Sequence, residues 1–336
     1  MLYNSGIGEK AFSVMGLGCW NFGGQWNKVS ETNAIEIIRY GIDHGINFVD
    51  VAESYGIPDG ECEILLGKAL QNGYREKVFL ISKVGWYGRR TSNHFYAKPS
   101  AYDKLMRKLY NRLNHFKSVD LEKRTPELIR LCGQACCGRL KTDYIDLLLC
   151  HDGAANDIPA FIEGFKWLKK EGFIKYYGIS TDSIDKLKEF YDYSEGECAA
   201  VECDYSLLNR TAESKLFPFC ETHGIKVFTR GTLASGLLSG KYDLLTTFKE
   251  PSRLSWNEGG KSRAQYIRKI NQIEKIKAVI GNEPLPDVSY KYAFSQYKNI
   301  SVVFGCTSIE QMKNNINIGD SYLDENILLA LNKQRL

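Results

Sequence analysis

Short apolar runs alternate with longer stretches in which apolar residues recur at helical spacing, from residue 17 to residue 317. The longer stretches predict helices, because residues such as Ala34, Ile37 and Ile38 would share one face. The predicted helices are 31–44, 60–71, 126–139, 158–171, 183–192, 211–223, 263–280 and 309–317. The apolar runs predict buried strands at 17–19, 46–50, 78–82, 144–150, 176–179, 199–203, 225–229 and 300–304.

This regular alternation of strands and helices, with no glycine-rich Rossmann loop after a strand, predicts an α/β protein, a (β/α)8 TIM barrel. An N-terminal β-hairpin, formed by 10–14 and the turn before it, is expected to close the bottom of the barrel. The chain contains no linker or low-complexity tract, so we expect a single domain over 1–336. An extended loop-and-helix insertion after the third strand covers about 85–120.

Polar side chains stand at or just beyond the ends of three predicted strands. Asp50 ends the strand before it, and Tyr55 follows in the next loop. Lys83 and His151 directly follow the strands at 78–82 and 144–150. A buried carboxylate is unfavourable unless it is paired, so Asp50 needs a cation; the alternative is that Asp50 caps a helix that begins near 59–61. In a barrel the carboxyl ends of the strands meet at one face, so these four side chains are expected to lie together.

These residues lie within strings that resemble the aldo-keto reductase family across nearly the whole chain. The strings, in family order, are GLGCW (16–20), GINFVDVAESYG (45–56), LISKV (80–84), RLKTDYIDLLLCH (139–151), IKYYGIS (174–180), YSLLNR (205–210), LASGLLSGKY (233–242) and GCTSIEQMKNN (305–315). The resemblance implies an NAD(P)-dependent oxidoreductase that interconverts a carbonyl (aldehyde, ketone or sugar) and an alcohol. It also implies a catalytic tetrad of Asp50, Tyr55, Lys83 and His151.

Two other functions compete with this interpretation. Some members of the family serve as non-catalytic, cofactor-sensing or regulatory subunits of larger assemblies, and a complete tetrad does not exclude that role. A lyase that forms a Schiff base on Lys83 would need a neutral lysine, whereas Asp50 should keep it charged.

In the predicted reaction Tyr55 supplies a proton while a nicotinamide supplies hydride. A free tyrosine has a pKa near ~10, so it is a poor acid at neutral pH. A neighbouring ammonium favours the phenolate, and Lys83 is therefore expected to lower the pKa of Tyr55. Asp50 would hold Lys83 charged and oriented. His151 would share a hydrogen bond with the substrate oxygen; the alternative is a histidine that only packs at the end of its strand.

The resemblance also implies a cofactor site, with NADP as the family default and NAD possible. The residues that it assigns to this site are Gly18, Cys19, Trp20, Asp50, Ser180, Thr181, Glu202, Arg230, Leu233, Gly236, Leu238, Gly305, Thr307, Gln311 and Asn315. Four positions depart from the family pattern. Arg230 stands where an aromatic residue often stacks under the nicotinamide. Thr181 replaces an asparagine, Glu202 replaces a glutamine that holds the nicotinamide carboxamide, and Gln311 replaces a basic residue that many members use for the 2′-phosphate. The last change weakens a preference for NADP. Gln311 and Asn315 could also be ordinary exposed helix residues.

Glu202 is the most informative of these departures. An ionised glutamate only accepts hydrogen bonds, so it can bind the carboxamide NH2 but not its oxygen. A carboxylate near the ring also favours the positively charged, oxidised nicotinamide. We therefore hypothesise that oxidised cofactor binds well and that the enzyme acts in part as an alcohol dehydrogenase. The alternative is that a nearby cation such as Arg230 neutralises Glu202.

The segment 86–117 is strongly basic, with eight Lys or Arg and one acidic residue. Its apolar residues recur at helical spacing, which predicts an amphipathic helix with a basic outer face. That face is either simply solvated or part of a lid that attracts an anionic substrate. The predicted walls of the substrate pocket are Trp20, Phe22, Trp26, Trp86 and Tyr87.

Composition narrows the remaining possibilities. The net charge of +4 is too small to indicate nucleic-acid binding, and no apolar run approaches the ~18–20 residues of a membrane span. No apolar signal-peptide core follows the first residues. The ten cysteines lack the spacing of a metal site, so we expect free thiols, no metal and a cytoplasmic location. The expected partner is a small-molecule substrate, and the expected state is a monomer or small homo-oligomer.

Overall fold

The computed structural model describes residues 1–24, 29–85, 124–151, 157–249 and 251–334. The predicted insertion helix and three predicted pocket residues, Trp26, Trp86 and Tyr87, lie outside these ranges. The basic face of the insertion also lies outside them.

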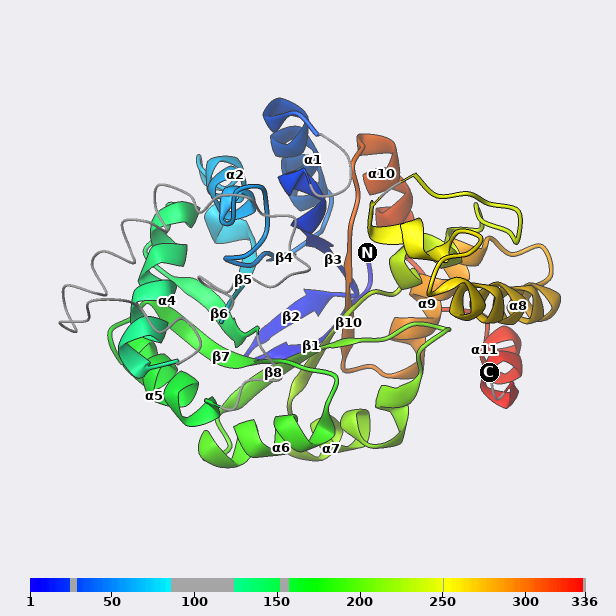
Figure 1. The fold of residues 1–336 in the computed structure, drawn as a ribbon. Coiled ribbons are helices and arrows are strands. Elements are labelled where there is room, and N and C mark those ends of the chain that lie inside the picture. Colours follow the sequence, from blue (N-terminus) through cyan, green and yellow to red (C-terminus); the bar gives the residue numbers. More distant parts are fainter. Residues whose placement is uncertain (25–28, 86–123, 152–156, 250, 335–336) are drawn as a thin grey trace.

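Eight parallel strands close into a barrel, which confirms the predicted fold class (Figure 1). Around the barrel the order is β10-β3-β4-β5-β6-β7-β8-β9. The strands are β3 (Met15–Gly18), β4 (Phe48–Asp50), β5 (Phe79–Val84), β6 (Ile145–Cys150), β7 (Ile174–Ser180), β8 (Cys198–Asp204), β9 (Lys226–Arg230) and β10 (Ile300–Phe304). All of them run in one direction, so their carboxyl ends form one face of the barrel.

Helices surround the strands on the outside (Figure 1). They are α1 (Glu31–Asp43), α2 (Glu61–Ala69), α4 (Pro126–Leu140), α5 (Ile158–Lys170), α6 (Ile184–Tyr193), α7 (Leu216–His223), α8 (Arg263–Ile280), α9 (Leu285–Gln296), α10 (Ile309–Ile318) and α11 (Glu325–Lys333). The Thr125 side chain caps α4 by accepting from the Leu128 amide. The prediction was wrong at three places: α9 and α11 were missed, and 211–223 is a short 3₁₀ turn followed by α7. The aromatic sequence of α9 shows little helical periodicity because many of its residues are buried.

The predicted hairpin is formed by β1 (Tyr3–Ile7) and β2 (Lys10–Ser13), which pair antiparallel. It covers the amino-terminal ends of the strands. Phe12 of the hairpin packs against Phe48, Phe79 and Phe228, with ring centroids 4.7–5.8 Å apart. These four buried rings pack together inside the barrel at the amino-terminal ends of the strands.

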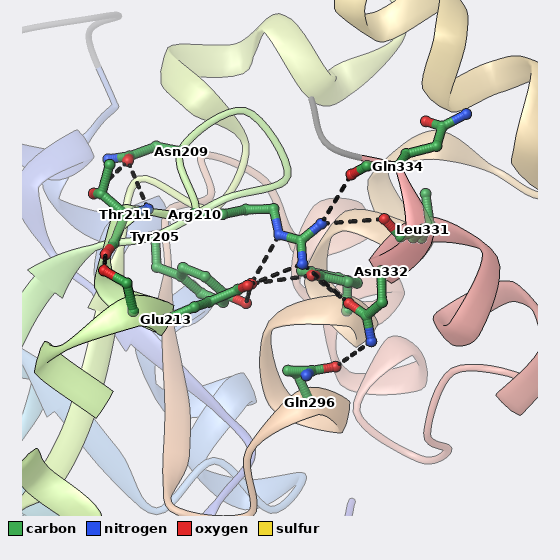
Figure 2. Close-up of polar contacts among 11 residues, drawn as sticks. Tyr205, Asn209, Arg210, Thr211, Glu213, Gln296, Leu331, Asn332 and Gln334 are labelled. Carbon is green, nitrogen blue, oxygen red and sulfur yellow. Dashed lines mark hydrogen bonds and ion pairs between the residues drawn. The ribbon is translucent and has the colours of Figure 1, made fainter. Parts of the chain in front are cut away.

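A polar network fastens the carboxyl-terminal helix to the barrel (Figure 2). Glu213 Oε1 accepts hydrogen bonds from the Tyr205 hydroxyl at 2.6 Å, Arg210 Nε at 2.9 Å and the Tyr292 hydroxyl at 3.0 Å. Arg210 also donates to the Leu331 carbonyl at 3.1 Å, near the end of α11. These hydrogen bonds join the chain's own side chains and carbonyl groups, so we regard this network as structural.

All ten cysteines are buried and none forms a disulfide, which confirms the expectation of free thiols. Within the described ranges, no helix is long and apolar enough to cross a membrane.

Candidate active site

Lys83 is the centre of the polar cluster at the carboxyl ends of the strands. Its side chain is fully buried, and Nζ lies 2.5 and 2.6 Å from the two carboxylate oxygens of Asp50. The Tyr55 hydroxyl lies 3.2 Å from the same nitrogen. Asp50 therefore has the cation that its burial requires, and it does not cap α2, whose N-cap is Gly60.

Neighbouring strands and one loop bring these groups together. Asp50 is the last residue of β4, and Lys83 is the last but one of β5, the adjacent strand. The loop that carries Tyr55 is tied to β5 through Glu53. The Glu53 amide donates to the Lys83 carbonyl at 3.1 Å, and its carboxylate accepts from the Gly85 amide at 2.6 Å. Glu53 was not singled out from the sequence, because nothing in a local pattern indicates a contact across 32 residues.

The net pKa shift of Tyr55 differs in direction from the expectation. Burial of the hydroxyl raises the pKa of Tyr55, and the charge of Lys83 opposes this shift without overcoming it. Asp50 and Glu202 add to the increase. For Lys83 burial lowers the pKa, but Asp50 and Glu202 outweigh burial and the net pKa is raised. The cluster therefore keeps Lys83 charged and Tyr55 protonated.

His151 and Trp20 lie on either side of Tyr55. The His151 ring lies edge-on to the Tyr55 ring at a centroid distance of 5.7 Å, and its amide donates to the Val84 carbonyl. The half-exposed Trp20 ring lies 6.3 Å from Tyr55. The structure thus brings the four tetrad residues and one predicted pocket residue to one place. Phe22 is buried in the main core, and its role as a pocket wall stays a prediction.

Glu202 joins this cluster from β8. Its side chain is 1% exposed, and Oε2 lies 3.4 Å from Lys83 Nζ. Oε2 has no hydrogen-bond donor among the described residues. Its other oxygen lies 3.9 Å from Arg230 Nε, at the end of β9. Ser180, the last residue of β7, pairs in register with Glu202. A hydroxyl and a buried acceptor with spare capacity therefore stand side by side, as a ligand amide requires.

Thr181 turns its side chain to its own loop, because its hydroxyl accepts from the Ser183 amide at 3.1 Å. On the neighbouring side of the barrel, the loop after β9 has a left-handed backbone at Ala234, Ser235 and Gly236. Arg253 fixes this conformation: its guanidinium donates to the Ser235 carbonyl at 2.5 Å and to Tyr242 at 2.7 Å. Arg253 was missed in the sequence, since it lies 18 residues from its partner.

Residues 305–315, assigned by resemblance to the adenosine end, surround the start of α10. Gln311 Oε1 accepts from the Thr307 amide at 2.8 Å and its own amide donates to the Ser308 hydroxyl, a reciprocal cap of the helix. Asn315 is 8% exposed, so it is not an ordinary exposed residue. A Cβ at Gly305 would meet Asn21 Nδ2, the end of a flexible side chain, at 2.4 Å. Among the described residues no three His, Cys, Asp or Glu side chains gather as metal ligands would.

The parallel barrel with an Asp–Lys–Tyr cluster and a histidine at its carboxyl face is the architecture of a barrel oxidoreductase. The family model of the aldo/keto reductase family matches residues 14–332, and the chain belongs to that family. Acting with NAD or NADP, it interconverts carbonyls and alcohols.

Relatives cover nearly all of the chain. The uncharacterized oxidoreductase YqkF of Bacillus subtilis (strain 168) is 31% identical over 93% of this chain and 88% of its own. The NADH-specific methylglyoxal reductase of Escherichia coli (strain K12) is 29% identical over 93% and 91%. The solved holo form of aldo-keto reductase AKR11C1 from Bacillus halodurans has a TM-score of 0.73, with 25% identity over 99% and 96% of the two chains.

Proposed function

We propose that Tyr55 is the general acid of carbonyl reduction and the general base of the reverse reaction. The observation that carries this proposal is the contact of the Tyr55 hydroxyl with Lys83 Nζ at 3.2 Å. As hydride reaches the carbonyl carbon, negative charge develops on the oxygen and that oxygen takes the Tyr55 proton. Lys83 stabilises the phenolate that remains, which offsets the raised pKa of Tyr55 at the moment of transfer.

Asp50 and His151 have supporting roles in this proposal. Asp50 orients Lys83 through two short contacts and keeps it charged. His151, whose ring lies against Tyr55, orients the carbonyl by a hydrogen bond to its oxygen. The nicotinamide supplies the hydride when the cofactor is bound.

The cofactor is proposed to lie across the carboxyl face of the barrel. Ser180 and Glu202 would hold the carboxamide, while Gly18, Cys19 and Trp20 lie beside the ring. The loop of Leu233, Gly236 and Leu238 would contact the pyrophosphate, and Gly305, Thr307, Gln311 and Asn315 the adenosine end. Gln311 is neutral and engaged in capping α10, which supports acceptance of NAD beside NADP. Measured dissociation constants for both cofactors test this assignment.

The proposed substrate is a small aldehyde, ketone or sugar. The NADH-specific methylglyoxal reductase among the relatives supports a short carbonyl compound. We also propose an anionic substrate, a monomer or small homo-oligomer, and a single domain. A cytoplasmic location is proposed as well, and the ten free thiols support it.

Oxidation of reduced nicotinamide in the presence of a panel of small carbonyls, including a neutral and an anionic member of similar size, tests the function. We expect turnover with at least one member. Tight cofactor binding without turnover of any carbonyl or alcohol would favour the regulatory barrel instead. Faster turnover of the anionic member, lost at high salt, is expected if charge attracts the substrate.

A further inference from the structure

Six ionisable side chains form a continuous chain of ion pairs at the carboxyl ends of the strands. The cations are Lys83 and Arg230, and the carboxylates are Asp50, Glu202, Asp182 and Asp204. We call these six residues the strand-end charge cluster. When all six are ionised, the cluster carries an excess of two negative charges. Asp182 and Asp204 were not singled out from the sequence. Both compete with Glu202 for the positive charge of Arg230.

Glu202 is the weaker partner of both cations. Lys83 Nζ lies 2.5 Å from Asp50 but 3.4 Å from Glu202. Arg230 contacts both oxygens of Asp182 at 3.2 Å, whereas Glu202 is 3.9 Å away. Arg230 Nη1 also lies 3.8 Å from Asp204. Arg230 is 41% exposed, so water further screens its charge. Its charge is therefore shared among three carboxylates and neutralises Glu202 only in part.

The position of Glu202 makes its charge effective. Its side chain is 1% exposed, and little water can screen a charge at that depth. Oε2 has no hydrogen-bond donor among the described residues, so its acceptor capacity is open to a ligand. One backbone amide and one side-chain amide also hold the surrounding carboxylates in place. The Asp204 amide donates to Asp182 at 2.7 Å, and Asn209 donates to Asp204 at 2.6 Å.

We propose that the strand-end charge cluster makes this site selective for the oxidised, positively charged nicotinamide over the neutral reduced form. Glu202 determines this selectivity directly, and Asp182 and Asp204 act through Arg230. The inference rests on the proposed function, because it assumes a nicotinamide beside Ser180 and Glu202. It goes further by assigning the enzyme a bias toward alcohol oxidation, in which Tyr55 must take up a proton.

Dissociation constants of the oxidised and the reduced cofactor, measured by protein fluorescence with the full chain, test the proposal. Glu202→Gln removes the buried charge and keeps the shape of the side chain. We expect the dissociation constant of the oxidised cofactor, divided by that of the reduced cofactor, to rise about tenfold, equivalent to ~1.4 kcal/mol. The variant then favours the reduced form more than the wild type does. The double variant Asp182→Asn, Asp204→Asn removes the two carboxylates that compete with Glu202 for Arg230, so Arg230 should neutralise more of the Glu202 charge. It should move the ratio in the same direction by a smaller factor.

Glu195→Gln is the matched control, because Glu195 is an exposed carboxylate in the connection that precedes β8 and is outside the cluster. It should leave the ratio unchanged. An unchanged ratio in Glu202→Gln, with both cofactor forms still bound, would overturn the charge inference and leave the proposed function standing. Failure of the wild-type protein to bind either form would instead overturn the proposed function. If Glu202→Gln does not fold, the double variant decides, since an unchanged ratio there also overturns the inference.

Discussion

Two lysines are buried at opposite ends of the same barrel, one beside carboxylates and the other among phenyl rings. Lys83, at the carboxyl end, contacts Asp50, Glu202 and Tyr55. Lys226, the first residue of β9, is 1% exposed and lies over the rings of Phe12 and Phe228 at 5.6 and 5.8 Å. Its Nζ has no hydrogen-bond acceptor among the described residues.

The difference in neighbours shifts the pKa values of the two amines in opposite directions. Carboxylates raise the pKa of Lys83 despite its burial. Burial lowers the pKa of Lys226 to about 7, and no carboxylate in the described part of the chain opposes this shift. Lys226 faces Ala200 of β8, Phe12 of the hairpin and Phe228 of its own strand, none of which is charged. At the carboxyl end, neighbouring carboxylates stabilise the charged form of Lys83. At the amino end, burial without such neighbours favours the neutral form of Lys226.

Lys83→Met should have the largest effect, because it removes the cation of the buried Lys83–Asp50 ion pair. Tyr55 loses its charged neighbour and Asp50 is left buried without its partner, so turnover should be lost. Removing one partner of a buried pair typically costs ~3–5 kcal/mol of stability. Urea unfolding and nicotinamide oxidation measure the two effects. A folded variant with wild-type activity and stability would contradict both the pairing and the catalytic role.

Tyr55→Phe should affect activity alone, since it removes the hydroxyl but not the ion pair of Lys83 and Asp50. Loss of a general acid typically lowers the rate by ~10²–10⁴-fold. The dissociation constant of the cofactor should stay close to that of the wild type, and so should stability. A rate loss below about tenfold, equivalent to ~1.4 kcal/mol, would show that another group supplies the proton.

Lys226→Met should have the opposite sign from Lys83→Met and stabilise the protein near neutral pH. In the folded state the amine is neutral above pH about 7, whereas in the unfolded chain it stays charged up to its ordinary pKa of 10.5. Between these values the unfolded chain binds one more proton. Lys226 therefore makes the free energy of unfolding rise with pH, by at most ~1.4 kcal/mol per pH unit.

Urea unfolding at pH 7 and pH 9 measures this contribution. Lys226→Met should be more stable than the wild type at pH 7 by roughly 1–4 kcal/mol, and the gap should narrow at pH 9. Activity should be unchanged, because the substitution lies at the far end of the barrel. The exposed Lys170→Met is the control and should alter neither the stability nor its pH dependence. A destabilised Lys226→Met with an unchanged pH profile would mean that the amine is charged and paired.

The sequence alone determined the barrel and most of the tetrad's arrangement. Strand runs and helical spacing are local, and parallel strands oblige residues at their carboxyl ends to share one face. Asp50 and Lys83 could therefore be placed together from their positions in the chain. The same local reasoning missed α9, where burial of residues on several sides of the helix hides any amphipathic pattern. It also missed the short α11, in which Leu331 is the buried residue.

Only the tertiary structure decided what surrounds each charge. Glu53 accepts a hydrogen bond from the Gly85 amide, and Arg253 donates one to the Ser235 carbonyl. The partners are far apart in the chain, so no local sequence pattern predicts these contacts. The net direction of the Tyr55 pKa depended on burial and on Glu202 as well as on Lys83. Lys226 drew no interpretation in the sequence, because a lysine at the start of a strand is usually solvated. Burial and electrostatic interactions depend on three-dimensional distance, and that quantity exists only once the barrel has closed.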